Sequence, residues 1–166
     1  EYFFIYRNKH NKKAQLLQDA LPYLQKSRGS IVGISSVAGL HGLPARTGYS
    51  ASKFAMTGLL ETIRIENLKR GVHVMIACPG FTASNVRYSA LTADGTAQGE
   101  TPRNEAKMMT AEEVARRVAE GIARRKRLCL MESEGRATHF VKKFAPSLLD
   151  RLFYWAMSRE ANSPLK

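Results

Sequence analysis

A chain of 166 residues is long enough for one domain with a hydrophobic core, and too short for two domains of ordinary size. Its apolar fraction of 44% and charged fraction of 24% are those of a globular protein, which excludes a wholly disordered chain. The formal net charge of +12 favours an anionic partner, such as a nucleic-acid backbone, a membrane surface or a phosphorylated ligand, and says nothing about the fold.

The first part of the chain predicts a helix followed by a strand. Residues 1–13 combine a short aromatic run with basic residues and fit no packed face, so we treat them as an atypical N-terminal segment. Leucine and alanine recur at helical spacing from Ala14, which predicts a helix ending near Arg28, where Gly29 can adopt the left-handed closing conformation. Residues 29–36 read as a short apolar strand of the kind buried on both faces of a parallel sheet.

The middle of the chain repeats this pattern. A second helix is predicted over residues 49–68 and a second buried strand over residues 72–78, which Pro79 and Gly80 terminate. Residues 85–109 are polar and contain glycine and proline, which predicts a loop.

A third helix and strand follow the loop. Thr110 and Glu113 form a capping box that predicts a helix to about residue 125, and residues 128–131 predict a third strand. Helices that alternate with apolar strands indicate an α/β fold, with a Rossmann-like parallel sheet and flanking helices, over residues 14–135.

Residues 136–166 form a basic, amphipathic C-terminal helical extension. Pro146 is expected to start a new helix within it. Four apolar residues fall four apart, at Phe140, Phe144, Leu148 and Leu152. We expect this apolar stripe to pack on the body of the protein, and a membrane-surface or partner helix is the alternative.

The two cysteines, Cys78 and Cys129, stand far apart inside apolar runs. No Cys-x-x-Cys or Cys/His spacing accompanies them, so neither a metal site nor a disulfide is expected, and buried thiols suit a reducing compartment. No run reaches the roughly 18 apolar residues of a membrane span. We therefore expect a cytoplasmic protein, with membrane association left open.

Tyr49 and Lys53 carry the main chemical signal. They lie four residues apart on the second helix, so their side chains share one face. A free tyrosine titrates near pH 10, and an ammonium group beside it favours the phenolate that acid/base work near neutral pH requires. Ser36, at the end of the first strand, is placed to hold a substrate carbonyl against the phenol. Tyr49, Lys53 and Ser36 are therefore the candidate catalytic residues.

A serine hydrolase is the rival chemistry, because Ser50-Ala51-Ser52-Lys53 formally satisfies a Ser-x-x-Lys motif. That class also needs Ser-Asp-Asn and Lys-Thr-Gly elements, and the sequence has neither. The hydrolase hypothesis is therefore disfavoured.

Three motifs resemble the later part of the short-chain dehydrogenase/reductase family, in order and in spacing. They are Gly29-Ser30-Ile31-Val32-x-Ile34-Ser35-Ser36, Tyr49-Ser50-Ala51-Ser52-Lys53 and Cys78-Pro79-Gly80-Phe81-Thr82. The resemblance implies that Tyr49 protonates the carbonyl oxygen as hydride arrives. Lys53 then assists Tyr49 and binds the nicotinamide ribose, and Ser36 positions the substrate oxygen.

The resemblance also implies a cofactor site at the end of the second strand. Pro79 and Gly80 would turn the chain beneath the nicotinamide, with the Thr82 backbone and the Ser84 hydroxyl near its carboxamide. The cofactor is NADP or NAD, with NADP favoured. The implied function is that of an oxidoreductase that acts on a small-molecule carbonyl or alcohol. Because members of the family commonly self-associate, the resemblance also implies a homodimer or tetramer.

Residues 85, 90–95 and 124–127 resemble the dehydrogenase/reductase member-7 type. Relatives of that branch act on lipid-like or steroid-like carbonyls, often at membranes. The implied partners therefore include a peripheral membrane contact through the basic C-terminus. Nucleic acid is not expected, because the positive charge is spread along helices and no groove-reading motif appears.

The sequence departs from the family in its first half. It contains no glycine-rich phosphate loop, and Gly39-x-x-Gly42 lacks the required spacing, so the dinucleotide-binding βαβ half is missing. The family's catalytic asparagine aligns with Lys9, between Asn8 and Asn11, and is not carried over. The alternative function is accordingly a truncated, non-catalytic fragment that binds a membrane surface or a partner and has no dinucleotide affinity.

Two histidines lie near these motifs. His41, in the loop before Tyr49, is interpreted as a surface residue rather than a substrate contact. His73, in the second strand, is interpreted as a packed residue rather than a ligand.

Overall fold

The computed structural model describes residues 12–44, 46–83, 96, 108–159 and 165. Its elements in chain order are α2 (Lys12–Ser27), β1 (Ser30–Ile34), η1 (Val37–Gly39), α3 (Thr47–Glu66), η2 (Leu68–Arg70), β2 (His73–Cys78), α4 (Ala111–Ala123), β3 (Leu128–Leu130), α5 (Ser133–Phe144) and α6 (Pro146–Ser158). The atypical segment and most of the predicted loop 85–109 lie outside the described residues.

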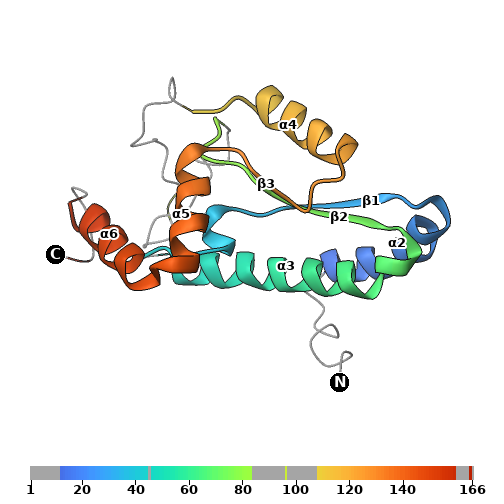
Figure 1. Cartoon of the computed structure of the whole chain (residues 1–166), viewed down its shortest axis with the longest axis horizontal. Coiled ribbons are helices and arrows are strands. Elements are labelled where there is room, and N and C mark those ends of the chain that lie inside the picture. Colours follow the sequence, from blue (N-terminus) through green and yellow to red (C-terminus); the bar gives the residue numbers. More distant parts are fainter. Residues whose placement is uncertain (1–11, 45, 84–95, 97–107, 160–164, 166) are drawn as a thin grey trace.

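The three strands form one parallel sheet in the order β1-β2-β3 (Figure 1). Ser30 pairs with His73 in the first ladder, and Ile76 pairs with Leu128 in the second. Every residue of β2 is buried, as expected for a strand that has a neighbour on each side and helices on each face. Within the described ranges β1 pairs only with β2, so it forms an edge of the sheet. The predicted parallel α/β fold is confirmed.

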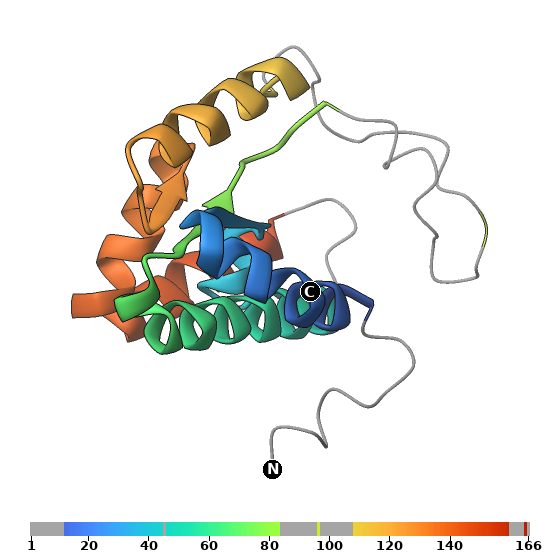
Figure 2. The ribbon, with the colours of Figure 1, turned by 90° about the vertical axis from the view of Figure 1, so that its right-hand side faces the viewer.

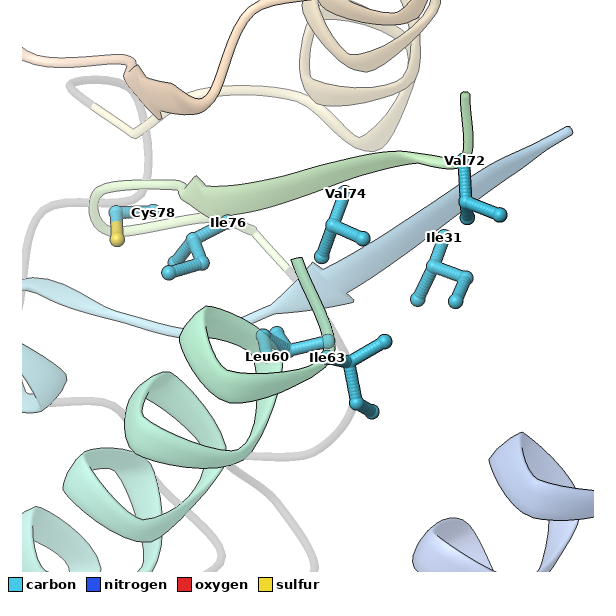
Figure 3. Packing of buried hydrophobic residues seen from close by; sticks show 7 residues of the cluster. All are labelled: Ile31, Leu60, Ile63, Val72, Val74, Ile76 and Cys78. Atoms are coloured by element: carbon cyan, nitrogen blue, oxygen red, sulfur yellow. The ribbon is translucent and has the colours of Figure 1, made fainter. Parts of the chain in front are cut away.

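Two apolar clusters hold the helices to the sheet. The first lies between the sheet and α3 and contains Ile31, Leu60, Ile63, Val72, Val74, Ile76 and Cys78 (Figure 3). Leucines of α2 pack against it. The second lies on the opposite face, where Met75 and Cys129 meet Val114 and Val118 of α4. Burying one such side chain contributes about 1.5–3 kcal/mol, so both clusters are main sources of stability.

The two helical crossovers have opposite hands. Helices α2 and α3 cover one face of the sheet and α4 covers the other (Figures 1 and 2). Both crossovers step in the same direction, from β1 to β2 and from β2 to β3. Because their helices lie on opposite faces, one of them departs from the strong right-handed preference of parallel crossovers.

The end of α2 differs from the prediction in one residue. The helix stops at Ser27, close to the expected position. It is Arg28, with φ of 51°, that adopts the left-handed conformation, and Gly29 does not. The Gly29 N–H instead closes the helix by donating to the Leu24 carbonyl, at 2.9 Å.

The C-terminal extension forms two helices, and Pro146 starts the second, as predicted. The prediction that the apolar stripe packs on the body is wrong, since Phe140 is 64% exposed and Phe144 is 72% exposed. The contact with the body comes from the adjacent row of α6, where Leu149 is buried and Phe153 meets the ring of His41. A four-residue period defines a stripe on a helix but does not say which stripe faces the core.

Helix α3 and the short turn η1 approach each other closely at Gly39. A side chain at this position would begin 2.5 Å from the Ser35 hydroxyl and 2.9 Å from the Lys53 carbonyl oxygen. Only glycine leaves room for this contact, which fixes the turn after β1 against the part of α3 that carries Lys53.

We predict that Gly39→Ala lowers the free energy of unfolding by about 1–3 kcal/mol, because the added methyl group must displace backbone of α3. Gly42→Ala is the matched control, since it lies in the same loop with no atom within 4 Å of the new methyl group. The control should change stability by less than about 0.5 kcal/mol. Urea unfolding of both variants measures the difference, and equal losses would show that the contact at Gly39 is not tight.

Candidate active site

The candidate residues lie at the carboxyl edge of the sheet, where β1 and β2 end. Ser36 follows β1 by two residues in extended backbone (φ −162°, ψ 166°) and caps the turn η1, its hydroxyl accepting a hydrogen bond from the Ala38 N–H at 3.2 Å. Tyr49 lies in the first turn of α3, and Lys53 lies one turn further along. Because α3 crosses back over the sheet, its amino end meets the carboxyl ends of the strands.

The ammonium of Lys53 bridges the strand end and the tyrosine. Its Nζ donates a hydrogen bond to the Ile34 carbonyl, the last residue of β1, at 3.0 Å. The same Nζ lies 5.6 Å from the centroid of the Tyr49 ring. A cation at this distance from an aromatic ring is attracted by it, so the strand end and the ring together hold the lysine in place.

Tyr49 is open to solvent, with 45% of its surface exposed. Its backbone carbonyl accepts from the Ser52 hydroxyl at 2.7 Å, while its phenol makes no hydrogen bond to any described residue. No hydrogen bond joins the Ser36 and Tyr49 side chains within the described ranges. The structure thus brings Lys53 to Tyr49 and leaves the phenol accessible to a bound molecule.

The thiol of Cys78 lies below this group, at the end of β2. Burial raises its pKa to about 12, and the neighbouring Cys129 adds to the rise. The Lys53 ammonium and the Ser36 backbone N–H lower the pKa of the thiol and partly offset this increase. Cys78 is therefore a protonated, unreactive packing residue beneath the site, as the sequence predicted for a buried thiol.

A side-chain hydrogen bond and a backbone bridge hold the segment after β2 in place. The Thr82 hydroxyl donates to the Gly80 carbonyl at 3.1 Å, and Thr82 forms an isolated parallel bridge with Met109. Pro79 and Gly80 make the turn that leads into this bridge. Ser84, the last predicted cofactor contact, lies outside the described residues.

Sequence reasoning missed Glu132, the second residue after β3. Its carboxylate accepts a hydrogen bond from the Phe81 N–H at 3.1 Å and fills the space beside Gly80. Glu132 therefore positions the Pro79–Gly80 turn from the neighbouring strand. The position of Glu132 directly after a predicted strand could have indicated this role, because polar residues that follow adjacent parallel strands meet at one edge of the sheet.

His41 does not lie on the surface, so its interpretation as a surface residue is wrong. It is 8% exposed, its ring centroid lies 4.6 Å from that of Phe153, and its Nε2 lies 4.0 Å from the Asp150 carboxylate. Burial lowers its pKa, Lys142 lowers it further and Asp150 opposes both. The histidine docks α6 beside the loop that precedes Tyr49.

Helix α5 is attached to the same loop. The Lys142 ammonium donates to the Leu40 carbonyl and lies 5.0 Å from the Phe54 ring centroid. The C-terminal helices therefore support the loop between Ser36 and Tyr49 from outside.

His73 is a packed residue, as predicted. It is buried, its Nδ1 is 3.0 Å from the Ser30 hydroxyl and its Nε2 is 2.9 Å from the Lys126 carbonyl. In the part of the chain that the structure describes, no three His, Cys, Asp or Glu side chains gather as a metal site would require.

The chain was compared with known protein families and with known proteins. The short chain dehydrogenase family model matches residues 13–94. The dehydrogenase/reductase SDR family member 7B of Mus musculus is 30% identical over 141 residues, covering 84% of this chain and 44% of the relative. The same-named protein of Xenopus laevis is 33% identical over 153 residues, covering 91% and 46%. The chain thus spans less than half the length of these relatives.

Solved structures share the fold. A short chain dehydrogenase from Burkholderia cenocepacia in complex with NADP superposes with a TM-score of 0.70 at 17% identity, covering 85% of this chain and 54% of that one. A short chain dehydrogenase/reductase from Burkholderia phymatum in complex with NAD gives 0.64 at 23% identity, covering 82% and 55%. Fold, motif order and sequence relatives agree: the chain belongs to the short-chain dehydrogenase family, and its relatives include the dehydrogenase/reductase member-7 type.

Proposed function

We propose that this chain carries the proton-transfer centre of an oxidoreductase that interconverts a carbonyl and a secondary alcohol. Tyr49 is the acid/base, Lys53 supports it electrostatically, and Ser36 positions the substrate oxygen. The observation that carries the proposal is the Lys53 ammonium, held by the Ile34 carbonyl at 3.0 Å and lying 5.6 Å from the Tyr49 ring.

The proposed step is a proton transfer at the Tyr49 oxygen. In the direction of reduction, the phenol gives its proton to the substrate oxygen and becomes a phenolate, which the Lys53 ammonium stabilises. In the direction of oxidation the same oxygen takes the proton back. The exposed phenol and the fixed ammonium support this assignment, since the acid must reach the substrate while its cation stays in place.

We propose that this edge of the sheet holds the nicotinamide end of a dinucleotide. Lys53 and Tyr49 would bind the ribose, and the turn at Pro79 and Gly80, with Thr82 and Ser84, would face the nicotinamide. NADP or NAD, when bound, supplies or accepts the hydride. The 166 residues contain no glycine-rich loop of the kind that binds the dinucleotide phosphates.

The proposed substrate is a lipid-like or steroid-like carbonyl, in keeping with the member-7 relatives. Exposed Phe144 and Leu148 support a peripheral membrane contact of α5 and α6, since apolar side chains interleaved with lysine and arginine suit an anionic lipid surface. In the described ranges, no helix has both the length and the apolar character needed to cross a membrane. Exposed Leu16 and Tyr23 on α2 support self-association as a dimer or tetramer.

We predict weak dinucleotide binding by the 166-residue chain, because the contacts that normally hold the phosphates are missing from it. Titration of NADPH and of NADH into the chain, followed by nicotinamide fluorescence, should give no saturation in the micromolar range for either. Saturable micromolar binding would contradict the prediction and show that the remaining residues suffice.

A chimera tests the catalytic assignment. We would join the amino-terminal part of the Xenopus laevis relative to residues 14–166 and follow NADPH oxidation with a panel of apolar ketones. Tyr49→Phe should lower kcat by at least about 10²-fold, because the phenyl ring cannot transfer a proton. Tyr154→Phe removes the same atom from an exposed tyrosine of α6 and should leave kcat unchanged.

The chimera also tests the alternative function, a non-catalytic binding fragment. A folded chimera that binds NADPH but reduces none of the ketones would favour the non-catalytic binding fragment. Equal turnover by Tyr49→Phe and the parent chimera would refute the role of Tyr49. Thermal unfolding of each variant shows whether a loss of turnover reflects chemistry or folding.

A further inference from the structure

Five cationic side chains gather at the edge of the sheet opposite to Tyr49. In a parallel sheet, the turns that lead from a helix into a strand all meet at one edge. Three such turns, before β1, β2 and β3, border an open groove of about 790 Å³. The groove is lined by five cationic side chains, Lys26, Arg28, Lys69, Arg70 and Arg125, and by no carboxylate.

Gly71 lines this basic groove and contacts two of its arginines. The Arg125 guanidinium donates to the Gly71 carbonyl at 2.7 Å. The Cγ and Cδ atoms of Arg28 lie 3.3 Å from the point where a side chain of residue 71 would begin. Gly71 itself has φ of 73°, so the backbone here favours glycine on conformational grounds too.

The same two arginines have an unusual backbone conformation. Arg28 and Arg125, with φ of 51° and 49°, are the two non-glycine residues of positive φ in the described part of the chain. Both follow the end of a helix, where glycine is the usual residue because it adopts this conformation without steric cost. Backbone strain of this kind, at two residues that meet in one groove, points to a use for their side chains.

The five cations are not neutralised by the protein. None of them forms an ion pair with a described acidic residue. Like charges that line one groove repel one another, so an anion that contacts several of them is bound more strongly than one that contacts a single cation. A volume of this size suits a small ligand, and no aromatic side chain lines the groove to stack on a base.

We propose that this groove binds a compact, multiply phosphorylated ligand. Arg28 and Arg125 contact it from opposite sides of Gly71, and Lys69 and Arg70 from η2 contact it from the third side. The ligand is either a soluble polyphosphate or the phosphorylated headgroup of a lipid, which share this chemistry. The inference is independent of the proposed catalytic function, since the groove and Tyr49 lie at opposite edges of the sheet.

Calorimetric titration of tripolyphosphate and of inositol hexakisphosphate into the whole chain tests the proposal. Arg28→Gly should weaken binding of the tighter probe about tenfold, the effect of losing one charged hydrogen bond. Its melting temperature should not fall, because glycine adopts the left-handed conformation more readily than arginine. A second variant, Lys69→Gln with Arg70→Gln, should weaken binding by at least as much.

The matched control removes the same charge from another surface. Arg136→Gln with Arg151→Gln takes two exposed arginines from α5 and α6 and should change the affinity by less than about twofold, a residual effect of net charge. An equal loss in the control and the groove variants would overturn the proposal, because the binding would then follow total charge alone. Failure of both probes to bind the parent chain at physiological salt would overturn it as well.

Vesicles containing phosphatidylinositol bisphosphate distinguish the two sources of phosphate. Vesicle binding that is lost in Arg28→Gly assigns the groove to a lipid headgroup, and binding of the soluble probes alone assigns it to a free polyphosphate. A duplex oligonucleotide serves as the competing polyanion. If the duplex binds more tightly than either compact probe, and binds equally to the groove variants, the proposal is wrong.

Discussion

The complete burial of β2 is the constraint on which the rest of the structure depends. β2 has a strand on each side and a helical layer on each face, and both neighbours run parallel to it through helical crossovers. Parallel strands send all their carboxyl ends to one edge and all their amino ends to the other. Tyr49, Lys53 and Glu132 gather at the first edge for this reason. The basic groove gathers at the second, from turns far apart in sequence.

The sequence predicted whatever is encoded locally. Segments of helical periodicity that alternate with short apolar runs predicted the parallel α/β fold. The spacing of Tyr49 and Lys53 predicted two side chains on one face of a helix. The position of Ser36 followed from the end of the apolar strand before it. These inferences succeed because each depends on neighbours within a few residues, or on the rule that carboxyl ends of parallel strands meet at one edge.

The remainder depends on distant contacts that no local pattern encodes. Glu132 positions the turn at Gly80 through a backbone N–H 51 residues away, so nothing near it in sequence marks the contact. His41 reads as a loop residue until α6 covers it with Phe153. The apolar stripe of α5 and α6 had the right period, but a neighbouring row of α6 packs on the body. Whether Ser84 contacts a cofactor stays a prediction.

Helix α3 connects the two edges as a single rigid rod. Its 20 residues span about 30 Å, with Tyr49 in the first turn and the cations of η2 just beyond the last. An intact helix keeps its length, so a shift of η2 along the axis would also displace Lys53, which donates a hydrogen bond to the end of β1. Any molecule whose affinity depends on that axial position is thermodynamically linked to the opposite edge. The linkage acts with equal strength in both directions.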